Sequence, residues 1–207
     1  MKQIYPTIGA AIVCLALAAC GSSPVEEEAP NTVEQSMQQL LNLDPASARE
    51  VRVLLENGSY QEAFKAANGI LVNKPGDPEA SLLAGEALLR LGRPQEALPY
   101  FENAATAEAF RAEALQGSGI ALYQSGKRDQ AVGQLSQAVA LNPALWRAYN
   151  ALGSIYDSDS AWPQAEAAYQ SALAVQPNSA LLHNNLAMSY MLQHRYDEAV
   201  PEFNRAL

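Results

Sequence analysis

The sequence predicts an all-α solenoid of paired helices, and three observations lead to this expectation. A segment of 34 residues recurs five times between residues 44 and 207. Aromatic residues make up only 7% of the chain while alanine is abundant, a composition that favours close helix packing over a sheet. Each copy also holds two stretches with apolar residues at helical spacing, so each copy should fold as two helices.

The register of the repeat depends on a column of alanine residues, each preceded by Glu or Gln. The column contains Ala63, Ala97, Ala131, Ala165 and Ala199. Pro75, Pro143 and Pro177 recur twelve residues later in three copies and mark the joins between copies. A fixed period of this length is typical of stacked repeat proteins. The units are placed at 44–77, 78–111, 112–145, 146–179 and 180–207, the first degenerate and the last incomplete.

The first nineteen residues have the features of a secretory signal. A polar start with Lys2 precedes the apolar stretch 8–17, which is too short for a comfortable membrane span. Residues 17–20, Leu-Ala-Ala-Cys, resemble the lipobox of bacterial lipoproteins. This resemblance implies that Cys20 is diacylated and becomes the first residue of the mature chain, which would then have no free thiol. The alternative is an ordinary secretory signal in which Cys20 is incidental.

Residues 20–33 are expected to form a disordered, acidic tether. The stretch contains two prolines and the run Glu26-Glu27-Glu28, and it has almost nothing to bury. The run could be a binding element, but a solvated spacer is favoured. Residues 34–43 are interpreted as a short N-terminal helix or linker before the first unit.

The repeat itself points to a known family through the spacing of its packing residues. The fourth copy is the fullest, with Tyr149, Leu152, Gly153, Tyr156, Ala165, Tyr169, Ala172 and Pro177. This pattern resembles the tetratricopeptide repeat over residues 44–207. The resemblance implies a right-handed superhelical α-solenoid of helix-turn-helix units, with a concave groove lined by the first helix of each unit. Pro99 and Pro201 depart from the pattern because they fall inside second helices, where proline costs a hydrogen bond.

In this family five positions of each unit point into the groove, namely the second, fifth, ninth, twelfth and thirteenth. In the second and third copies these positions hold Glu79, Leu82, Glu86, Leu89, Arg90, Glu113, Gln116, Ile120, Tyr123 and Gln124. In the fourth and fifth copies the groove becomes rich in amides and methionines. The basic and Asn pattern with which some family members clamp a terminal carboxylate is missing, since Ala151 and Leu181 stand where those residues are needed.

The peptide-binding residues are predicted towards the C-terminal half of this groove. They are Tyr123, Arg147, Asn150, Ser154, Asn184, Asn185, Met188 and Met191. Asn amides can pair with both the N–H and the C=O of an extended peptide, and Met adapts to varied apolar side chains. The alternative is that residues 188–192 merely face a further helix. Trp146 and Trp162 are interpreted as packing residues first and contact residues second.

Charge and the absence of catalytic motifs exclude several function classes. The chain carries 22 acidic against 13 basic residues, a net charge of −9, which disfavours nucleic acid as a partner. His183 occupies an aromatic packing position and His194 falls near a turn, so a structural role is favoured over metal binding or acid–base catalysis. The sequence has no phosphate-binding loop or nucleophile elbow. We expect no enzymatic activity, cofactor or metal, and a function carried by protein-binding surfaces.

A narrower resemblance suggests which assembly this scaffold serves. Residues 145–153, Leu-Trp-Arg-Ala-Tyr-Asn-Ala-Leu-Gly, with 183–186, His-Asn-Asn-Leu, resemble the lipoprotein of tight-adherence (Flp) pilus assembly. This implies an outer-membrane lipoprotein that faces the periplasm of a Gram-negative bacterium and helps to position the secretion channel. Gly21 after Cys20 agrees with the outer membrane by family analogy, with membrane contact only through the lipid. The alternative is an envelope adaptor for outer-membrane protein assembly, or for peptidoglycan enzymes or proteases.

The C-terminal end of the sequence is expected to be a second binding surface. The chain stops at Leu207, before the position at which the proline of the repeat recurs. Val200, Phe203 and Leu207 are therefore expected to lack a following helix that covers them. Solenoids normally finish with a polar capping element. The expectation is either a truncated product or a partner, such as a second copy of the chain in a homo-oligomer.

Overall fold

The structure is a computed structural model that describes residues 47–207, and this part of the chain folds as ten helices without strands. The predicted signal peptide, Cys20, the tether and segment 34–43 lie outside the described residues. The helices are α2 (Ala48–Glu56), α3 (Tyr60–Asn73), α4 (Pro78–Arg90), α5 (Pro94–Ala104), α6 (Glu108–Gln124), α7 (Arg128–Leu141), α8 (Trp146–Ser158), α9 (Trp162–Val175), α10 (Ala180–Leu192) and α11 (Tyr196–Arg205).

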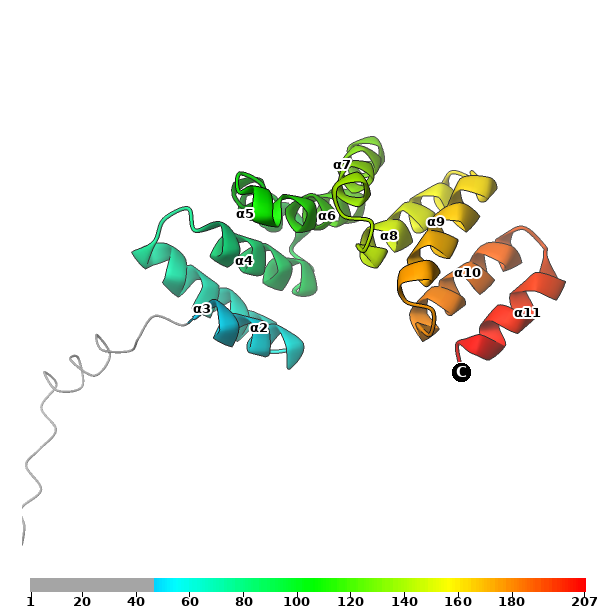
Figure 1. Ribbon diagram of the computed structural model, residues 1–207, viewed down its shortest axis with the longest axis horizontal. Helices are drawn as coiled ribbons and strands as arrows, with labels where there is room; N and C mark the ends of the chain where they lie inside the picture. The colour runs from blue at the N-terminus through cyan, green and yellow to red at the C-terminus, as the bar shows by residue number, and fades with distance from the viewer. Residues whose placement is uncertain (1–46) are drawn as a thin grey trace, which may run out of the picture. The chain divides into compact units, whose positions relative to one another are not determined.

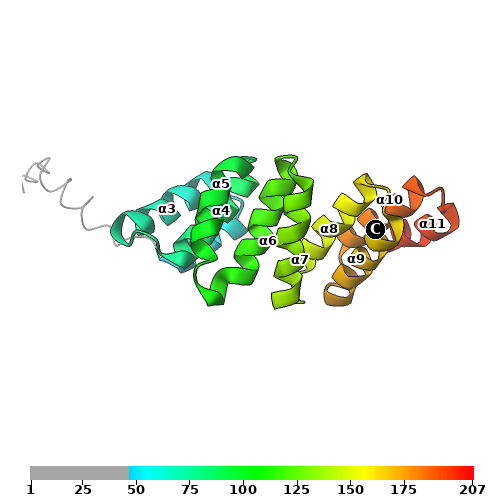
Figure 2. The same ribbon diagram turned by 90° about the horizontal axis from the view of Figure 1, so that it is seen from above.

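The helices form a solenoid in which each pair packs against the next, so the predicted all-α solenoid is confirmed. Figures 1 and 2 show the helices following one another in chain order from α2 to α11. The even-numbered helices contact one another along the series α2, α4, α6, α8 and α10, whereas the odd-numbered helices of this part contact only the even-numbered ones. The first helices of the units therefore form a continuous inner layer. The second helices of the described residues form an outer layer in which they do not contact one another.

Small residues sit where the two helices of a unit cross. The alanine column of residues 63, 97, 131, 165 and 199 is fully buried, as the repeat pattern predicts. The large residue of the outer helix packs on a glycine of the inner layer. A Cβ atom placed on Gly153 would lie 2.6 Å from Cε1 of Tyr169, and one placed on Gly85 would lie 2.7 Å from Cε1 of Phe101. Glycine is therefore required at these crossings, because any larger residue would overlap the ring.

The turn inside each unit ends with a residue in the left-handed backbone region. Residues 58, 92, 126, 160 and 194 follow the 34-residue period and all have φ between 56° and 78°. The first three are glycine, which adopts this conformation without steric cost, but the last two are Ser160 and His194. His194 therefore lies in the turn between α10 and α11, close to where the sequence places it.

Two local features differ from an ideal repeat. Helix α6 begins at Glu108, ahead of the predicted unit boundary at residue 112. The physical reason is that Ala109 stands where three other copies have proline, so nothing blocks an earlier helix start. Pro99 and Pro201 lie inside α5 and α11, as their spacing predicts.

The last outer helix agrees only in part with the expectation of an uncovered end. Val200 and Leu207 are exposed. Within residues 47–207 no helix follows Phe203 either, but its side chain is partly buried against the preceding helices, at the cluster formed by Ala165, Tyr169, Leu186, Tyr190 and Ala199. The reason is that Phe203 stands in the same column as Phe101 and Tyr169, whose side chains turn back towards the inner layer.

Candidate protein-binding groove

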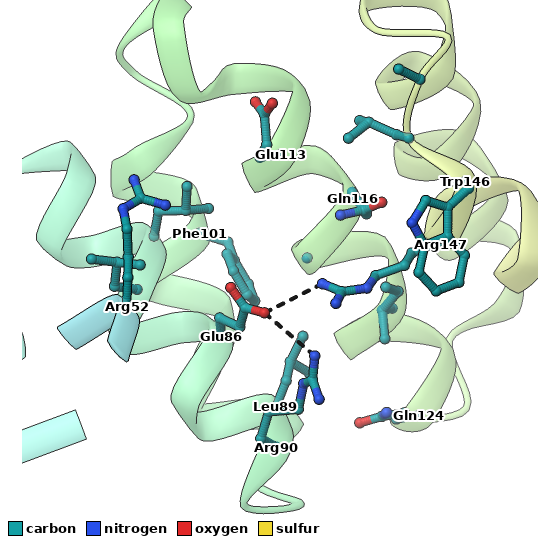
Figure 3. Close-up of a pocket in the computed structure, with 16 residues that line it drawn as sticks. Arg52, Glu86, Leu89, Arg90, Phe101, Glu113, Gln116, Gln124, Trp146 and Arg147 are labelled. Atoms are coloured by element: carbon teal, nitrogen blue, oxygen red, sulfur yellow. Dashed lines mark hydrogen bonds and ion pairs between the residues drawn. The ribbon is translucent and has the colours of Figure 1, made fainter. Parts of the chain in front are cut away.

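A hollow of about 380 Å³ opens on the inner layer between α2, α4, α6 and α8 (Figure 3). We call it the N-terminal groove. Its residues from α4 and α6 are spaced at intervals of three, four, seven and eight, so each helix presents one face to the hollow. They are Leu82, Leu83, Glu86, Leu89, Arg90, Glu113, Gln116, Gly117, Ile120 and Gln124. Most are groove positions by their place in the repeat, and Arg147 of α8 joins them.

Glu86 is the charged centre of the N-terminal groove. Its Oε1 atom lies 3.4 Å from Nη1 of Arg147 and 3.6 Å from Nη2 of Arg90 (Figure 3). The contact with Arg147 joins residues 61 positions apart in the chain and links the second unit to the fourth. One carboxylate oxygen thus serves two guanidinium groups, each of which offers five N–H donors. The cluster of these three residues keeps one positive charge in excess.

The other charged residues of the groove have partners of their own. Nη2 of Arg52 lies 2.8 Å from Oε1 of Glu79. Nδ2 of Asn142 donates a hydrogen bond of 3.5 Å to Oε1 of Glu113. The Asn142 amide is neutral, so Glu113 keeps a negative charge at the groove, whereas the cluster around Glu86 carries a positive excess.

Aromatic residues shape the walls and position of the groove. Phe101 reaches it from the outer helix α5 because Gly85 and Gly117 leave room for its ring. Trp146 opens α8, and the guanidinium carbon of Arg147 lies 5.4 Å from the centre of its ring, a cation–π distance. Trp146 is partly buried, which agrees with packing and contact roles together.

Gln116 carries an unused hydrogen-bonding atom at the groove. Its Oε1 atom is buried and has no hydrogen-bond partner among the residues that the structure describes. An acceptor left unpaired in this way costs about 1–3 kcal/mol, and a ligand N–H that reached it would remove that cost. Because this oxygen is buried, the Gln116 amide must turn towards the groove before it can accept from a peptide backbone.

A second hollow, the C-terminal hollow, lies between α8, α9 and α10. Its lining residues include Ser154, Asp157, Trp162, Tyr169, Asn185, Met188 and Leu192. Met188 and Leu192 are about half exposed, so within residues 47–207 no further helix covers them. Of the two alternatives for residues 188–192, a free groove face fits the described structure.

Hydrogen bonds hold the polar side of the C-terminal hollow in place. Oδ1 and Oδ2 of Asp157 accept bonds of 2.6 Å from the Ser189 hydroxyl and 2.9 Å from the Tyr169 hydroxyl. Burial, with a smaller contribution from the nearby Asp157 carboxylate, raises the pKa of the Tyr169 hydroxyl well above its ordinary value. Tyr169 is therefore a neutral donor at physiological pH. This network keeps α8, α9 and α10 in fixed relative positions.

The eight predicted peptide-binding residues are divided between these places. Arg147 belongs to the N-terminal groove, and Ser154, Asn185 and Met188 line the C-terminal hollow. Nδ2 of Asn185 donates a 2.8 Å hydrogen bond to Oδ1 of Asn150, so the two amides already pair with each other.

The remaining three lie elsewhere on the inner layer. Tyr123 packs against the central apolar cluster, and Asn184 and Met191 are exposed on α10. The peptide-binding role of all eight residues stays a prediction.

Sequence reasoning did not single out the residues at the centre of the N-terminal groove. Glu86, Arg90 and Gln116 hold groove positions. The peptide-binding residues are nevertheless predicted in the C-terminal half of the groove, because that half is rich in amides and methionines. Arg52 holds the ninth position of the degenerate first unit, 44–77. Applying the five groove positions of the family to that unit as well would have identified it. Nothing in the sequence alone shows that the ring of Phe101 reaches from an outer helix to the groove.

The two histidines have structural partners. Nδ1 of His183 lies 2.6 Å from Oε2 of Glu202, and Nε2 lies 2.9 Å from the carbonyl oxygen of Pro177. Nδ1 of His194 lies 2.7 Å from the Tyr196 hydroxyl. No group of three or more His, Cys, Asp or Glu residues suited to a metal ion occurs within residues 47–207. No helix within that range is long and apolar enough to span a bilayer.

Solved structures of repeat proteins share this fold. The MamA protein from Desulfovibrio magneticus RS-1, residues 41 to the end, is 26% identical, with a TM-score of 0.62 over 77% of this chain and 90% of that one. A thermophilic tetratricopeptide-repeat protein from Thermus thermophilus is 24% identical, with a TM-score of 0.68 over 77% of this chain and 88% of that one. The second likeness shows the fold alone.

Curated relatives are much longer than this chain. Cellulose synthase operon protein C of Escherichia coli K12, and its putative counterpart in Escherichia coli O157:H7, are 35% identical over 99 residues. That stretch is 48% of this chain but only 8% of each relative.

A family profile covers nearly all of the described residues. Residues 48–114, 117–170 and 158–207 match the tetratricopeptide repeat. The same segments hold the helix pairs, the buried alanine column and the periodic left-handed turns. The chain therefore belongs to the tetratricopeptide-repeat family and is a scaffold for protein–protein interaction.

Proposed function

We propose that this protein is an outer-membrane lipoprotein of the periplasm that helps to assemble a pilus or secretion system of the tight-adherence (Flp) type. Its task is to bind or position the outer-membrane secretion channel. The family supports a protein-binding scaffold. The lipobox-like segment 17–20 supports the anchor, and the strings 145–153 and 183–186 support the pilus assignment by resemblance.

The observation that carries the proposal is the N-terminal groove. It is a preformed hollow on an inner layer of four successive first helices, with apolar walls and a few convergent polar groups. A rigid solenoid with such a face can hold an extended segment of a partner without reorganising itself. Chemistry on the bound partner is not required for this role, because holding two components in register is sufficient to promote assembly.

Lipidation at Cys20 would place the groove close to the membrane. Residues 21–33 span at most about 45 Å when fully extended. Several acyl chains, at about 0.8 kcal/mol per buried CH₂ group, give stable anchoring. The scaffold would then work near the base of a channel in the outer membrane.

Deletion of the gene in its own bacterium tests the pilus proposal. Loss of surface pili and of channel multimers in the outer-membrane fraction, both restored by the intact gene, is the expected result. Complementation with the Cys20→Ser variant should restore little, and a palmitate analogue should no longer label the protein. Normal pili and normal channel multimers in the deletion strain would overturn the proposal.

A second candidate is a role beside a cellulose synthase. One observation favours it, the 35% identity with cellulose synthase operon protein C over 99 residues. The same deletion strain separates the two candidates. Loss of cellulose with intact pili would support the second candidate and contradict the first.

A further inference from the structure

We infer that the N-terminal groove selects an extended peptide segment with an acidic side chain flanked by apolar residues. This inference rests on the proposed function only in that the groove must bind protein. It adds the chemistry of the segment that is bound. The acidic side chain would lie between Arg90 and Arg147, and the apolar side chains would lie against the leucines of α4 and Ile120 of α6.

The arginine contacts at Glu86 are long for this protein. The two N–O distances are 3.4 and 3.6 Å. Arg52 with Glu79 and Arg195 with Glu166 reach 2.8 Å. Charge-assisted hydrogen bonds of full strength lie near 2.7–2.9 Å. Arg90 and Arg147 are therefore held near Glu86 without being saturated by it.

Both guanidinium groups are accessible. The side chains of Arg147 and Arg90 are 46% and 42% exposed, and both contacts go to Oε1 of Glu86. A carboxylate from the bound peptide would join Glu86, and the two carboxylates would then balance the two guanidinium groups. The rings of Trp146 and Tyr60 lie 5.4 and 5.9 Å from the guanidinium carbons of Arg147 and Arg90 and limit their freedom. Less side-chain entropy is then lost when the ligand binds.

The surroundings of this charge favour a polypeptide over a small anion. Leu82, Leu89 and Ile120 provide apolar surface beside the arginines. The Oε1 atom of Gln116 is buried without a partner among the described residues, and it would accept from a ligand backbone N–H once its amide turned towards the groove. An acidic residue within an apolar peptide meets all three requirements, whereas a free phosphate or acetate would meet only the first.

The net charge of −9 on the whole chain does not prevent an acidic side chain from binding beside the two arginines of the groove. Salt screens charges beyond about 8 Å at physiological ionic strength, so the groups within the groove dominate the final contact. The same net charge disfavours nucleic acid, whose many phosphates would approach the whole acidic surface.

Selection from a phage-displayed library of random peptides, each about twelve residues long, tests the inference with the full chain in detergent micelles. Enrichment of Asp or Glu beside Leu, Ile or Phe is expected in the recovered peptides. One recovered peptide, labelled with fluorescein, then serves as the probe for variants. Arg147→Glu should weaken its binding about tenfold or more, as expected for losing a charge-assisted contact. The matched control is Arg128→Glu, whose arginine is equally exposed and pairs with Asp159 outside the groove.

The outcomes distinguish this inference from the function on which it rests. Enriched peptides without acidic residues, or equal affinities for Arg147→Glu and Arg128→Glu, would overturn the acidic selection and leave groove binding intact. If no peptide is enriched on the parent chain over a bare micelle, peptide binding by the groove itself is wrong. A Gln116→Leu variant that binds the probe several times more weakly would support the backbone contact.

Discussion

The ring of Phe101 packs against the backbone of Gly117, so closely that a Cβ atom at residue 117 would overlap the ring. Phe101 comes from the outer helix α5 and Gly117 from the inner helix α6. Both also line the N-terminal groove. The crossing that joins the second unit to the third therefore also sets the shape of the groove, and the two cannot be changed independently.

Gly117→Ala should destabilise the fold by about 1–3 kcal/mol, because the added methyl group overpacks a full crossing. The matched control is Gly133→Ala on α7, where a Cβ atom would meet nothing within 4 Å. That change should stabilise the protein by up to about 1 kcal/mol through helix propensity. Urea unfolding of both variants measures the difference. Shifts of the same sign would show that the crossing is not as tight as described.

Ala165→Leu should cost roughly 1–3 kcal/mol by overpacking, since Ala165 is fully buried in the column where the helices of the fourth unit cross. Ala167→Leu is the control, because Ala167 lies two residues away on the same helix and is exposed. Thermal melting should place the first variant below the parent and the second close to it. Identical melting of both variants would mean that the 34-residue register is wrong.

His194→Gly should stabilise the protein by about 0.5–1 kcal/mol, because a residue with a Cβ atom is strained at positive φ whereas glycine is not. His194 has φ 61°, and glycine already stands at residues 58, 92 and 126 of the same column. The lost hydrogen bond to Tyr196 is exposed and worth little. A melting temperature below that of the parent would show that this contact outweighs the backbone strain.

Glu202→Leu should destabilise the packing of α10 on α11 by about 1–3 kcal/mol, the cost of leaving a buried polar group unpaired. The group is Nδ1 of His183, which is buried against Oε2 of Glu202, while Nε2 faces the Pro177 carbonyl, an acceptor. Nε2 therefore carries a proton. Glu202→Gln should cost less, because its amide can donate to Nδ1 of a neutral imidazole. Equal losses in urea unfolding for the two variants would contradict this arrangement.

The sequence predicts the layers of this fold well because the repeat makes local and tertiary preferences agree. The alanine column, the large residues that face it and the joins marked by proline all follow from spacing. The contact of Glu86 with Arg147 does not, because it joins side chains 61 residues apart whose meeting depends on the pitch of the solenoid and on rotamers. The pairing of Asn150 with Asn185 is hidden for the same reason. The sequence therefore allows candidate residues to be chosen only by their chemical type and repeat position. The structure is needed to show which of these side chains lie close together.

The central claim is that the inner layer of first helices binds the protein partner. Photo-crosslinking in living cells tests it directly, with p-benzoylphenylalanine placed at Gln124, an exposed residue of the N-terminal groove, or at Ser136, an exposed residue of the outer helix α7. The account predicts a discrete adduct of higher mass from position 124 and none from position 136. Adducts from position 136 alone, or from neither position, would contradict it.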